Sequence, residues 1–248
     1  MKTKILFSLF ALATASLLAA DSSPKDEITA GAKKLAQKDN YAWKAANEFA
    51  SFTSTADGKA DKDGLVWLAV TYAERTTEAF LKGGKGAVKQ ADQEWQSFAE
   101  VENDPGPVQF LVRRLQTFKA PAEQVQDLAT KVKEVKKEGE TYSGELTEAG
   151  AKELLSFGRR RSDDAPAPKN AKASVKLWTK DGMISKYELK LSGTVSFGGD
   201  EQDIEGNTTV EIKEVGKTKL ELPAACRNTI STRTNQQIEV SVFIAIKK

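Results

Sequence analysis

The sequence predicts an α+β protein: a curved antiparallel sheet with helices covering its concave face. Residues 183–197 alternate apolar and polar side chains, as in a strand with one buried face and one wet face. The same alternation marks the end of the chain, where the apolar positions are Ile238, Val240, Val242, Ile244 and Ile246. Residues 108–118 and 125–132 have helical spacing instead. A sheet with one apolar face must be covered, and these mid-chain helices are the available cover.

The first half of the predicted sheet follows a helix. Ser23 is a candidate N-cap and Pro24 occupies the first helical position, so we expect a helix that ends near Asn40. Strands are then expected over residues 41–53, 65–72 and 77–81. Residues 65–72 are apolar at both parities, which indicates a strand covered on both faces.

Two kinds of glycine-containing segment predict turns in this half. Asp57-Gly58 and Asp63-Gly64 are turn signals, and we expect them to bracket a charged loop. Gly83-Gly84-Lys85-Gly86 resembles part of a phosphate-binding loop, but the full motif needs Ser or Thr where Ala87 stands. A hairpin turn is therefore expected there.

The second half continues the pattern after a polar interruption. Thr147 is expected to cap a short helix over residues 151–157. Residues 158–170 predict a flexible loop, in which Arg159 to Arg161 are either solvated or in contact with anionic lipid headgroups. Further extended segments are expected at 142–146, 175–177, 210–212 and 220–222. A short helix is expected at 224–230.

The first twenty residues predict a secretory signal peptide. Lys2 and Lys4 form a positive start, residues 5–18 are apolar, and Ala19-Ala20 offers small residues for cleavage after Ala20. A membrane anchor is the alternative, but the apolar run is shorter than the ~20 residues that span a bilayer. We expect a periplasmic or secreted protein with one domain over residues 21–248.

Composition excludes most catalytic and metal-binding classes. The chain has no histidine and one cysteine, Cys226, which is expected to be a small buried residue. Ser-His-Asp triads, Cys-His pairs, histidine-based zinc sites and internal disulfides are therefore excluded. We expect no enzyme activity, no cofactor and no metal site. Without the two lysines of the signal peptide, the mature chain has as many basic as acidic residues, which argues against nucleic-acid binding.

Paired carboxylates, as in glycosidases, remain the one catalytic alternative. The acidic candidates are Glu100, Glu102, Asp104, Glu145 and Glu148. They fall in loops and helix starts, where acids are expected as caps and solvated charges.

Large apolar side chains on the predicted sheet and lid suggest an incompletely closed interior. If the helices cover only part of the curved sheet, an apolar cavity remains, and such cavities hold lipophilic ligands. Ordinary core packing is the alternative for each of these residues. The candidate cavity residues are Trp43, Phe49, Trp67, Phe110, Leu111, Leu115, Tyr187, Leu189, Leu191 and Phe197.

Three stretches resemble a known family: LVWLAVTYAERTTEAFLKGG, SVKLWTKDGMISKYELKLSGTV and TTVEIKEVGKTKLELP. They are similar to the periplasmic lipoprotein carriers LolA and LolB and to the LppX/LprG lipid carriers. The resemblance implies a half-barrel of antiparallel strands with a helical lid, acyl chains in its concavity, no catalysis and no cofactor. The insert at 158–170 and the tail from Arg227 to Lys248 depart from the family.

The function expected from these observations is a non-catalytic carrier of lipid or acylated protein. We expect a monomer that works with an envelope membrane complex. The alternative is an envelope interaction or sensor module, in which the protein's own side chains fill the core.

Overall fold

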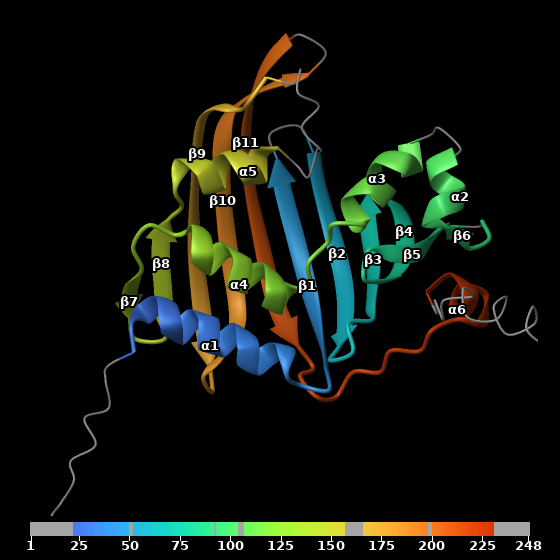
Figure 1. Cartoon of the computed structure of the whole chain (residues 1–248), viewed down its shortest axis with the longest axis horizontal. Coiled ribbons are helices and arrows are strands. Elements are labelled where there is room, and N and C mark those ends of the chain that lie inside the picture. Colours follow the sequence, from blue (N-terminus) through green and yellow to red (C-terminus); the bar gives the residue numbers. More distant parts are fainter. Residues whose placement is uncertain are drawn as a thin grey trace, which may run out of the picture.

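The computed structural model describes residues 22–49, 52–91, 93–103, 107–156, 166–197 and 200–230. Eleven strands form one antiparallel sheet in the order β6-β5-β4-β3-β2-β1-β11-β10-β9-β8-β7 (Figure 1). The strands are β1 (Asn40–Phe49), β2 (Phe52–Asp61), β3 (Val66–Tyr72), β4 (Arg75–Lys82), β5 (Lys85–Gln90), β6 (Gln96–Ser97), β7 (Lys136–Glu138), β8 (Thr141–Glu145), β9 (Lys169–Lys180), β10 (Met183–Phe197) and β11 (Asp200–Lys213). The helices are α1 (Pro24–Ala36), α2 (Phe98–Asn103), α3 (Pro107–Leu115), α4 (Pro121–Lys131), α5 (Glu148–Leu155) and α6 (Ala224–Ile230).

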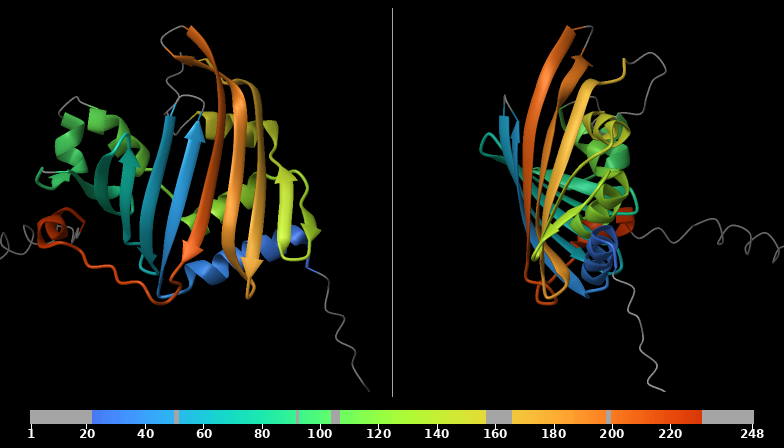
Figure 2. Two further views of the ribbon diagram at one scale, coloured as in Figure 1. Left: turned by 180° about the vertical axis from the view of Figure 1, so that it is seen from behind. Right: turned by 90° about the vertical axis from the view of Figure 1, so that its left-hand side faces the viewer.

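The predicted fold class is confirmed. The sheet is open, because β6 and β7 lie at opposite edges. Helices α1, α4 and α5 lie together on one side of it, as the side view in Figure 2 shows. Two meanders make up the sheet, β1 to β6 and β7 to β11, and they join where β1 pairs with β11.

The first helix starts where the sequence predicts. The backbone amide of Asp26 donates to Ser23 Oγ over 3.2 Å, and Ser23 Oγ in turn donates to the Asp26 carboxylate over 2.7 Å. One face of α1 is buried through Ile28, Ala32 and Leu35. That face packs between the sheet and α4, so the amphipathic spacing read from the sequence is used for core contact.

Strand parity divides the sheet into an inner face under α1 to α5 and an outer face. The inner face contributes Trp43, Leu68 and Tyr187 to the main core. The outer face of β3 to β5 carries a second, smaller core, in which Phe80 packs with Cys226 of α6. The expected covering on both faces holds for residues 65–68, where Val66 and Leu68 belong to the main core and Leu65 and Trp67 pack on the second core, but not for the end of β3, where Tyr72 is exposed.

Three expectations for turns and strands are wrong. The predicted strand 41–53 is divided: β1 ends at Phe49 and β2 begins at Phe52. Asp57-Gly58 is not a turn but lies within β2, opposite Lys44 and Trp43 of β1. Residues 220–222 form no strand, because the chain after β11 runs along the sheet to α6 and packs Leu220 and Leu222 on the second core.

Gly58 is explained by contact rather than by a turn. A Cβ atom placed on Gly58 would lie 2.1 Å from the ring of Trp43. The indole, which is 3% exposed, therefore lies flat on the backbone of the neighbouring strand. A glycine within a strand can therefore indicate that a neighbouring side chain lies against the backbone, as well as a turn.

One hairpin, one helix cap and one further helix lie where the sequence predicts them. The hairpin at Gly83-Gly84 joins β4 to β5, and Thr147 caps α5 by accepting from the amide of Gly150 over 3.1 Å. α6 occupies the predicted helix at 224–230, and β9 begins at Lys169, inside the expected loop. The predicted signal peptide, the segment Arg159 to Arg161 and the predicted strand at 238–246 lie outside the described residues.

Replacing Gly58 by alanine is expected to destabilise the protein by about 1–3 kcal/mol, because the new methyl group overlaps the Trp43 ring. Urea unfolding followed by tryptophan fluorescence measures this. Thr55→Ala, at an exposed position of the same strand, is the matched control and should change stability by less than about 0.5 kcal/mol. Equal stability of Gly58→Ala and the unmodified protein would contradict the contact.

The thiol of Cys226 is expected to be unreactive in the folded protein. Burial raises its pKa to about 11, and its side chain is fully buried beside Phe80. Labelling by an aromatic disulfide reagent at pH 8 should proceed only after denaturant is added. Rapid labelling of the native protein would show that α6 is not held against the sheet.

Candidate functional site on the inner face

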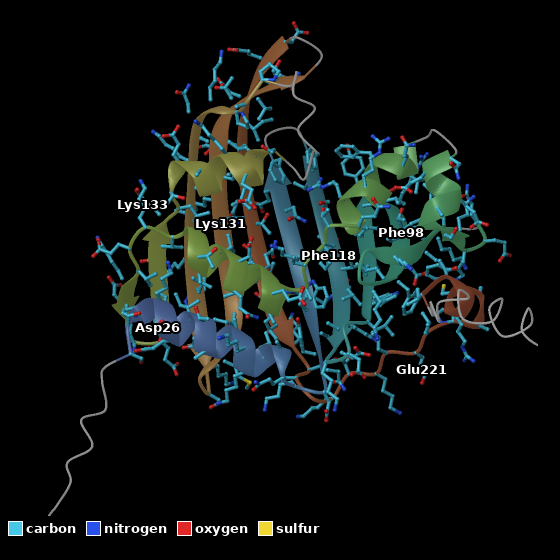
Figure 3. All side chains as sticks on the ribbon, in the orientation of Figure 1. Asp26, Phe98, Phe118, Lys131, Lys133 and Glu221 are labelled. Atoms are coloured by element: carbon cyan, nitrogen blue, oxygen red, sulfur yellow. The ribbon has the colours of Figure 1, made fainter. Side chains whose placement is uncertain are left out.

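The lower part of the inner face is filled by the protein's own side chains. Trp43, Leu115 and Tyr187 are 3%, 4% and 1% exposed, and Leu191 is 7% exposed. Phe118 lies in the link between α3 and α4 (Figure 3). Its ring stacks on Trp43 with the ring centroids 6.3 Å apart. These predicted cavity residues are brought together, but as a packed core.

Two tyrosines fix α4 on the sheet. The hydroxyl of Tyr187 donates to Gln124 Oε1, and the hydroxyl of Tyr41 accepts from the amide of Ala122 over 3.4 Å. Burial is the main cause that raises the pKa of both phenols, so both stay neutral at physiological pH. The first turn of α4 is therefore tied to β1 and β10 at buried positions.

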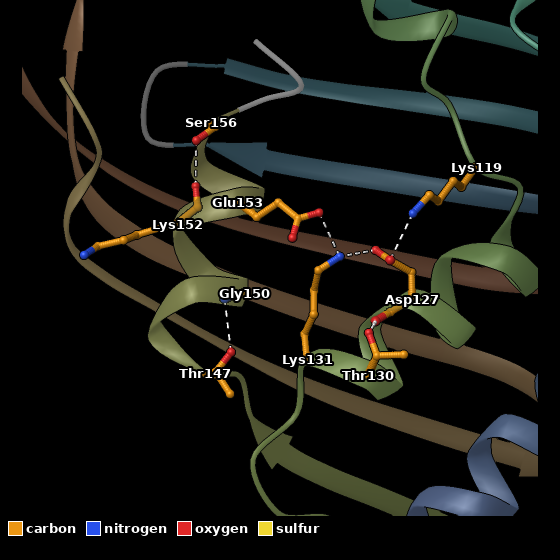
Figure 4. Close-up of polar contacts among 9 residues, drawn as sticks. All are labelled: Lys119, Asp127, Thr130, Lys131, Thr147, Gly150, Lys152, Glu153 and Ser156. Atoms are coloured by element: carbon orange, nitrogen blue, oxygen red, sulfur yellow. Dashed lines mark hydrogen bonds and ion pairs between the residues drawn. The ribbon is translucent and has the colours of Figure 1, made fainter. Parts of the chain in front are cut away.

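A network of ion pairs joins α4 to α5. Asp127 lies between Lys119 and Lys131, with Lys119 Nζ 2.9 Å from its carboxylate (Figure 4). Lys131 Nζ also reaches Glu153 of α5 at 3.0 Å. Partial burial by itself would raise the pKa of Asp127, but hydrogen bonds from the two lysines outweigh it and hold the pKa below its usual value. The two helices are therefore held together over the sheet.

Among the described residues, no helix covers the upper part of the inner face. In Figure 1 the upper ends of β1 and β2 lie between α5 and α3, with no helix drawn across them. We call this surface the open window. It is made of the inner-face residues Ala45, Asn47 and Phe49 of β1, Phe52, Ser54 and Ala56 of β2, and Val70 and Tyr72 of β3.

Three aromatic rings form the upper border of the open window. Phe49 and Phe52 face each other across β1 and β2 and stack with centroids 5.1 Å apart. Tyr72 meets Phe52 edge-on at 5.9 Å. Phe52 is 39% exposed and Tyr72 54%, although both occupy inner-face positions. Aromatic rings at such positions normally lie under a covering layer.

Register extends the aromatic border toward α5. Phe49 pairs with Gly206 of β11, and Gly206 pairs with Leu191 of β10. A Cβ atom on Gly206 would lie 2.3 Å from the Phe49 ring, so glycine is required for the ring to lie flat there. The aromatic row thus runs without a break into the buried core.

A polar row lies directly below the aromatic border. Asn47 Nδ2 donates to Ser54 Oγ over 3.4 Å, and Thr208 Oγ1 donates to Asn47 Oδ1 over 3.0 Å. Below it follow the small, half-buried side chains of Ala45, Ala56 and Val70. The open window therefore combines aromatic rings, hydrogen-bonding groups and small apolar side chains within a few residues of one another.

The remaining predicted cavity residues are placed elsewhere. Trp67 lies on the outer face, where its indole nitrogen donates to Glu78 over 3.1 Å. Phe110 is 54% exposed on α3, and Leu111 packs partly against the main core. Leu189 is a half-buried inner-face residue of β10. Phe197 ends β10, and its side chain is outside the described part.

Sequence reasoning missed Phe52 and Tyr72. Phe52 begins β2 and Tyr72 ends β3, and Phe52 was assigned to the preceding strand because the turn was expected at Asp57-Gly58. Since Phe52 pairs with Phe49 across β1 and β2, the two residues take the same face. Parity along β3 from the buried Leu68 also places Tyr72 on that face.

Two hollows of about 1030 and 630 Å³ lie along β9 and β10. The larger one reaches the open window, because Phe49 lines it together with Gly206 and Leu191. Lys172, Lys190 and Glu205 line it as well, so its surface is charged in part and apolar in part.

The acidic candidates have structural partners. Glu100 caps α2 by accepting from the amide of Ser97 over 2.6 Å, and Glu102 accepts from Gln116 over 2.7 Å. Glu148 pairs with Lys152 at 2.6 Å, and Glu145 lies 3.9 Å from Lys133. Asp104 lies outside the described residues. Within the described ranges, no group of three or more Cys, Asp or Glu side chains is arranged to hold a metal ion, and no helix is long and apolar enough to cross a membrane.

No protein-family model matches the sequence, and no curated protein matches it. Among solved structures, the crystal structure of LprF from Mycobacterium bovis is similar, with 11% identity and a TM-score of 0.45 over 82% of this chain and 96% of that chain. The MucA/MucB complex of Pseudomonas aeruginosa is similar at 12% identity and a TM-score of 0.29, over 80% and 99% of the two chains. At TM-scores below 0.5, neither match carries a conclusion about what this chain binds.

The network around Asp127 predicts a pH-dependent contribution to stability. A lowered folded-state pKa means that the contribution is present above the ordinary value of 3.8 and is lost as the pH falls through the folded pKa. Asp127→Asn should cost about 1 kcal/mol at neutral pH, with a difference from the unmodified protein that shrinks in acid. Urea unfolding at several pH values measures this.

Asp39→Asn is the matched control, since Asp39 pairs with Lys62 at an exposed position. Solvent screens that pair, so Asp39→Asn should change stability less than Asp127→Asn does at neutral pH. A cost for Asp127→Asn that stays constant down to the acid limit would contradict an electrostatic role for the network.

Proposed function

We propose that this chain is a non-catalytic, extracytoplasmic binding protein that holds an acyl chain, of a lipid or of an acylated protein, on the open window. The single observation that carries the proposal is the exposure of Phe52 and Tyr72 on the side of the sheet that the helices otherwise cover. The predicted signal peptide supports the extracytoplasmic location.

The surface suits an elongated apolar guest. With strands about 4.8 Å apart, the row from Leu191 through Gly206 and Phe49 to Phe52 is about 14 Å long. Each methylene buried on such a surface contributes about 0.8 kcal/mol. Asn47, Ser54 and Thr208 lie one row below and offer hydrogen bonds to a polar end of the ligand.

The guest in this proposal lies on the sheet, at the edge of the packed core, and not inside the protein. Tyr187 and Trp43 occupy the place that an internal cavity would need. Entry of an acyl chain below α4 would require breaking the Tyr187–Gln124 hydrogen bond and the α4–α5 ion pairs. Binding at the window requires neither change.

A filled core is also what the second candidate function, an envelope interaction or sensor module, requires. In that case the open window is a contact surface for a protein, and the aromatic rings are its anchors. The two functions share a surface and differ in the chemistry of the partner, so lipid binding separates them.

Replacing Phe52 and Tyr72 together by alanine is expected to weaken binding of a fluorescent fatty acid at least tenfold, because a loss of 1.4 kcal/mol corresponds to that factor. Titration of the mature protein, followed by ligand fluorescence, measures this. Trp178→Ala is the matched control: this aromatic lies on the outer face, with Lys186 4.8 Å from its ring. Its affinity should match that of the unmodified protein.

The unmodified protein must also carry or take up lipid. Mass spectrometry of organic extracts from protein purified out of its own compartment should find acyl chains. A protein that is empty, ignores fatty acids and lipopeptides, and copurifies with one stoichiometric protein partner would replace the carrier proposal by the interaction module.

A further inference from the structure

We infer that the upper edge of β11, residues 200–205, is a docking edge for an extended, basic segment of another protein, which adds to the sheet as a strand. This inference is independent of lipid binding at the open window. It rests on the pairing pattern of the longest strands and on the charges that border them.

The β10–β11 hairpin extends beyond its neighbours. β10 pairs with β11 from Lys186 to Phe197, whereas β1 pairs with β11 only as far as Gly206 opposite Phe49. Residues 200–205 are therefore bonded to β10 on one side, and among the described ranges no strand pairs with them on the other. Figure 1 shows this hairpin rising above the rest of the sheet.

An edge of six residues is about 20 Å long at the rise of a strand. Its unpaired amide and carbonyl groups are a template for an added strand, and natural proteins either protect such edges or use them for peptide binding. The other two edge strands are shorter, since β6 has two residues and β7 has three.

The charge on this edge selects the occupant. Glu201, Asp203 and Glu205 alternate along β11 and point to the outer face, and all three are exposed. Glu48, the last outward residue of β1, continues the same series and lines the larger hollow together with Glu205. Lys169 pairs with Glu201, and Thr194 donates to Asp203 over 2.7 Å, so the acids are oriented by β9 and β10.

A second copy of this chain is a poor occupant, because pairing two such edges would place acid opposite acid. A strand with Lys or Arg at every second position would place a cation beside each acid. Its other side chains would lie on the inner face beside Asp200, Gln202 and Ile204, next to the aromatic border of the open window. Charge and strand geometry thus point to the same partner chemistry, an extended segment with a basic residue at every second position.

The test uses the full mature protein and three labelled, end-capped octapeptides: (Lys-Val)4, (Lys-Pro)4 and (Glu-Val)4. Proline keeps the charge but removes the amide hydrogens that a strand needs. Fluorescence anisotropy at low salt should show that (Lys-Val)4 binds with at least tenfold higher affinity than (Lys-Pro)4 or (Glu-Val)4. Hydrogen exchange should show slower exchange of the amides of residues 200–205 when (Lys-Val)4 is bound.

Charge reversal supplies the variant arm. E201K/D203K/E205K should bind (Lys-Val)4 with at least tenfold lower affinity and (Glu-Val)4 with higher affinity than the unmodified protein. Circular dichroism checks that the variant is folded. E138K/E140K, which reverses two exposed acids at the opposite end of the sheet, should bind all three peptides as the unmodified protein does.

Three results would overturn the inference. Equal binding of (Lys-Pro)4 would show attraction of charge without strand addition. Strong protection, in the free protein, of those amides of residues 200–205 that point away from β10 would show that another part of this chain already occupies the edge. Absence of peptide binding would leave the acids with the single role of keeping the edge from aggregating.

Discussion

The contact of Trp43 with the backbone at Gly58 is the interaction on which the rest of the structure depends. The indole lies flat on the neighbouring strand, which no residue larger than glycine would permit. It also stacks on Phe118 and meets Tyr41 at 5.8 Å, so one ring joins β1, β2 and the link that leads into α4. With that link fixed, Tyr41 and Tyr187 place the first turn of α4, and the ion pairs of Asp127 and Lys131 place α5.

This arrangement covers one part of the sheet and leaves another part open. Helices held by buried hydrogen bonds and by a four-residue ion-pair network are not free to slide along an eleven-stranded sheet. The upper ends of β1, β2 and β3 therefore keep aromatic inner-face residues with no helix of the described ranges above them. The proposed binding function depends on this difference between the area of the sheet and the smaller area that the helices cover.

The sequence could predict what depends on local pattern. The alternation in residues 183–197 identified β10, and Ser23 and Thr147 identified two helix starts. The two covered faces expected for residues 65–72 are present at residues 65–68. It could not predict what depends on which strands become neighbours. Gly58 was mistaken for a turn residue because its reason, the Trp43 ring, is fifteen positions away, and the same error concealed Phe52.

The candidate site shows the same division. Phe49 was expected to contact the ligand and lies in the open window. Tyr187, Leu191 and Leu115 were expected there too but are buried in the core. The alternation of a strand shows which side chains point to the inner face, but it does not show which of them a helix covers. Trp67 was placed on the wrong face, since a strand that is apolar at both parities does not reveal which parity faces the larger core.

The most direct measurement is the location of the guest itself. A crystal structure of the mature protein saturated with a long-chain fatty acid is predicted to show the acyl chain in contact with Phe49, Phe52 and Tyr72, with α4 still bonded to Tyr187. An acyl chain found between α4 and the sheet, with Tyr187 displaced, would contradict binding at the open window.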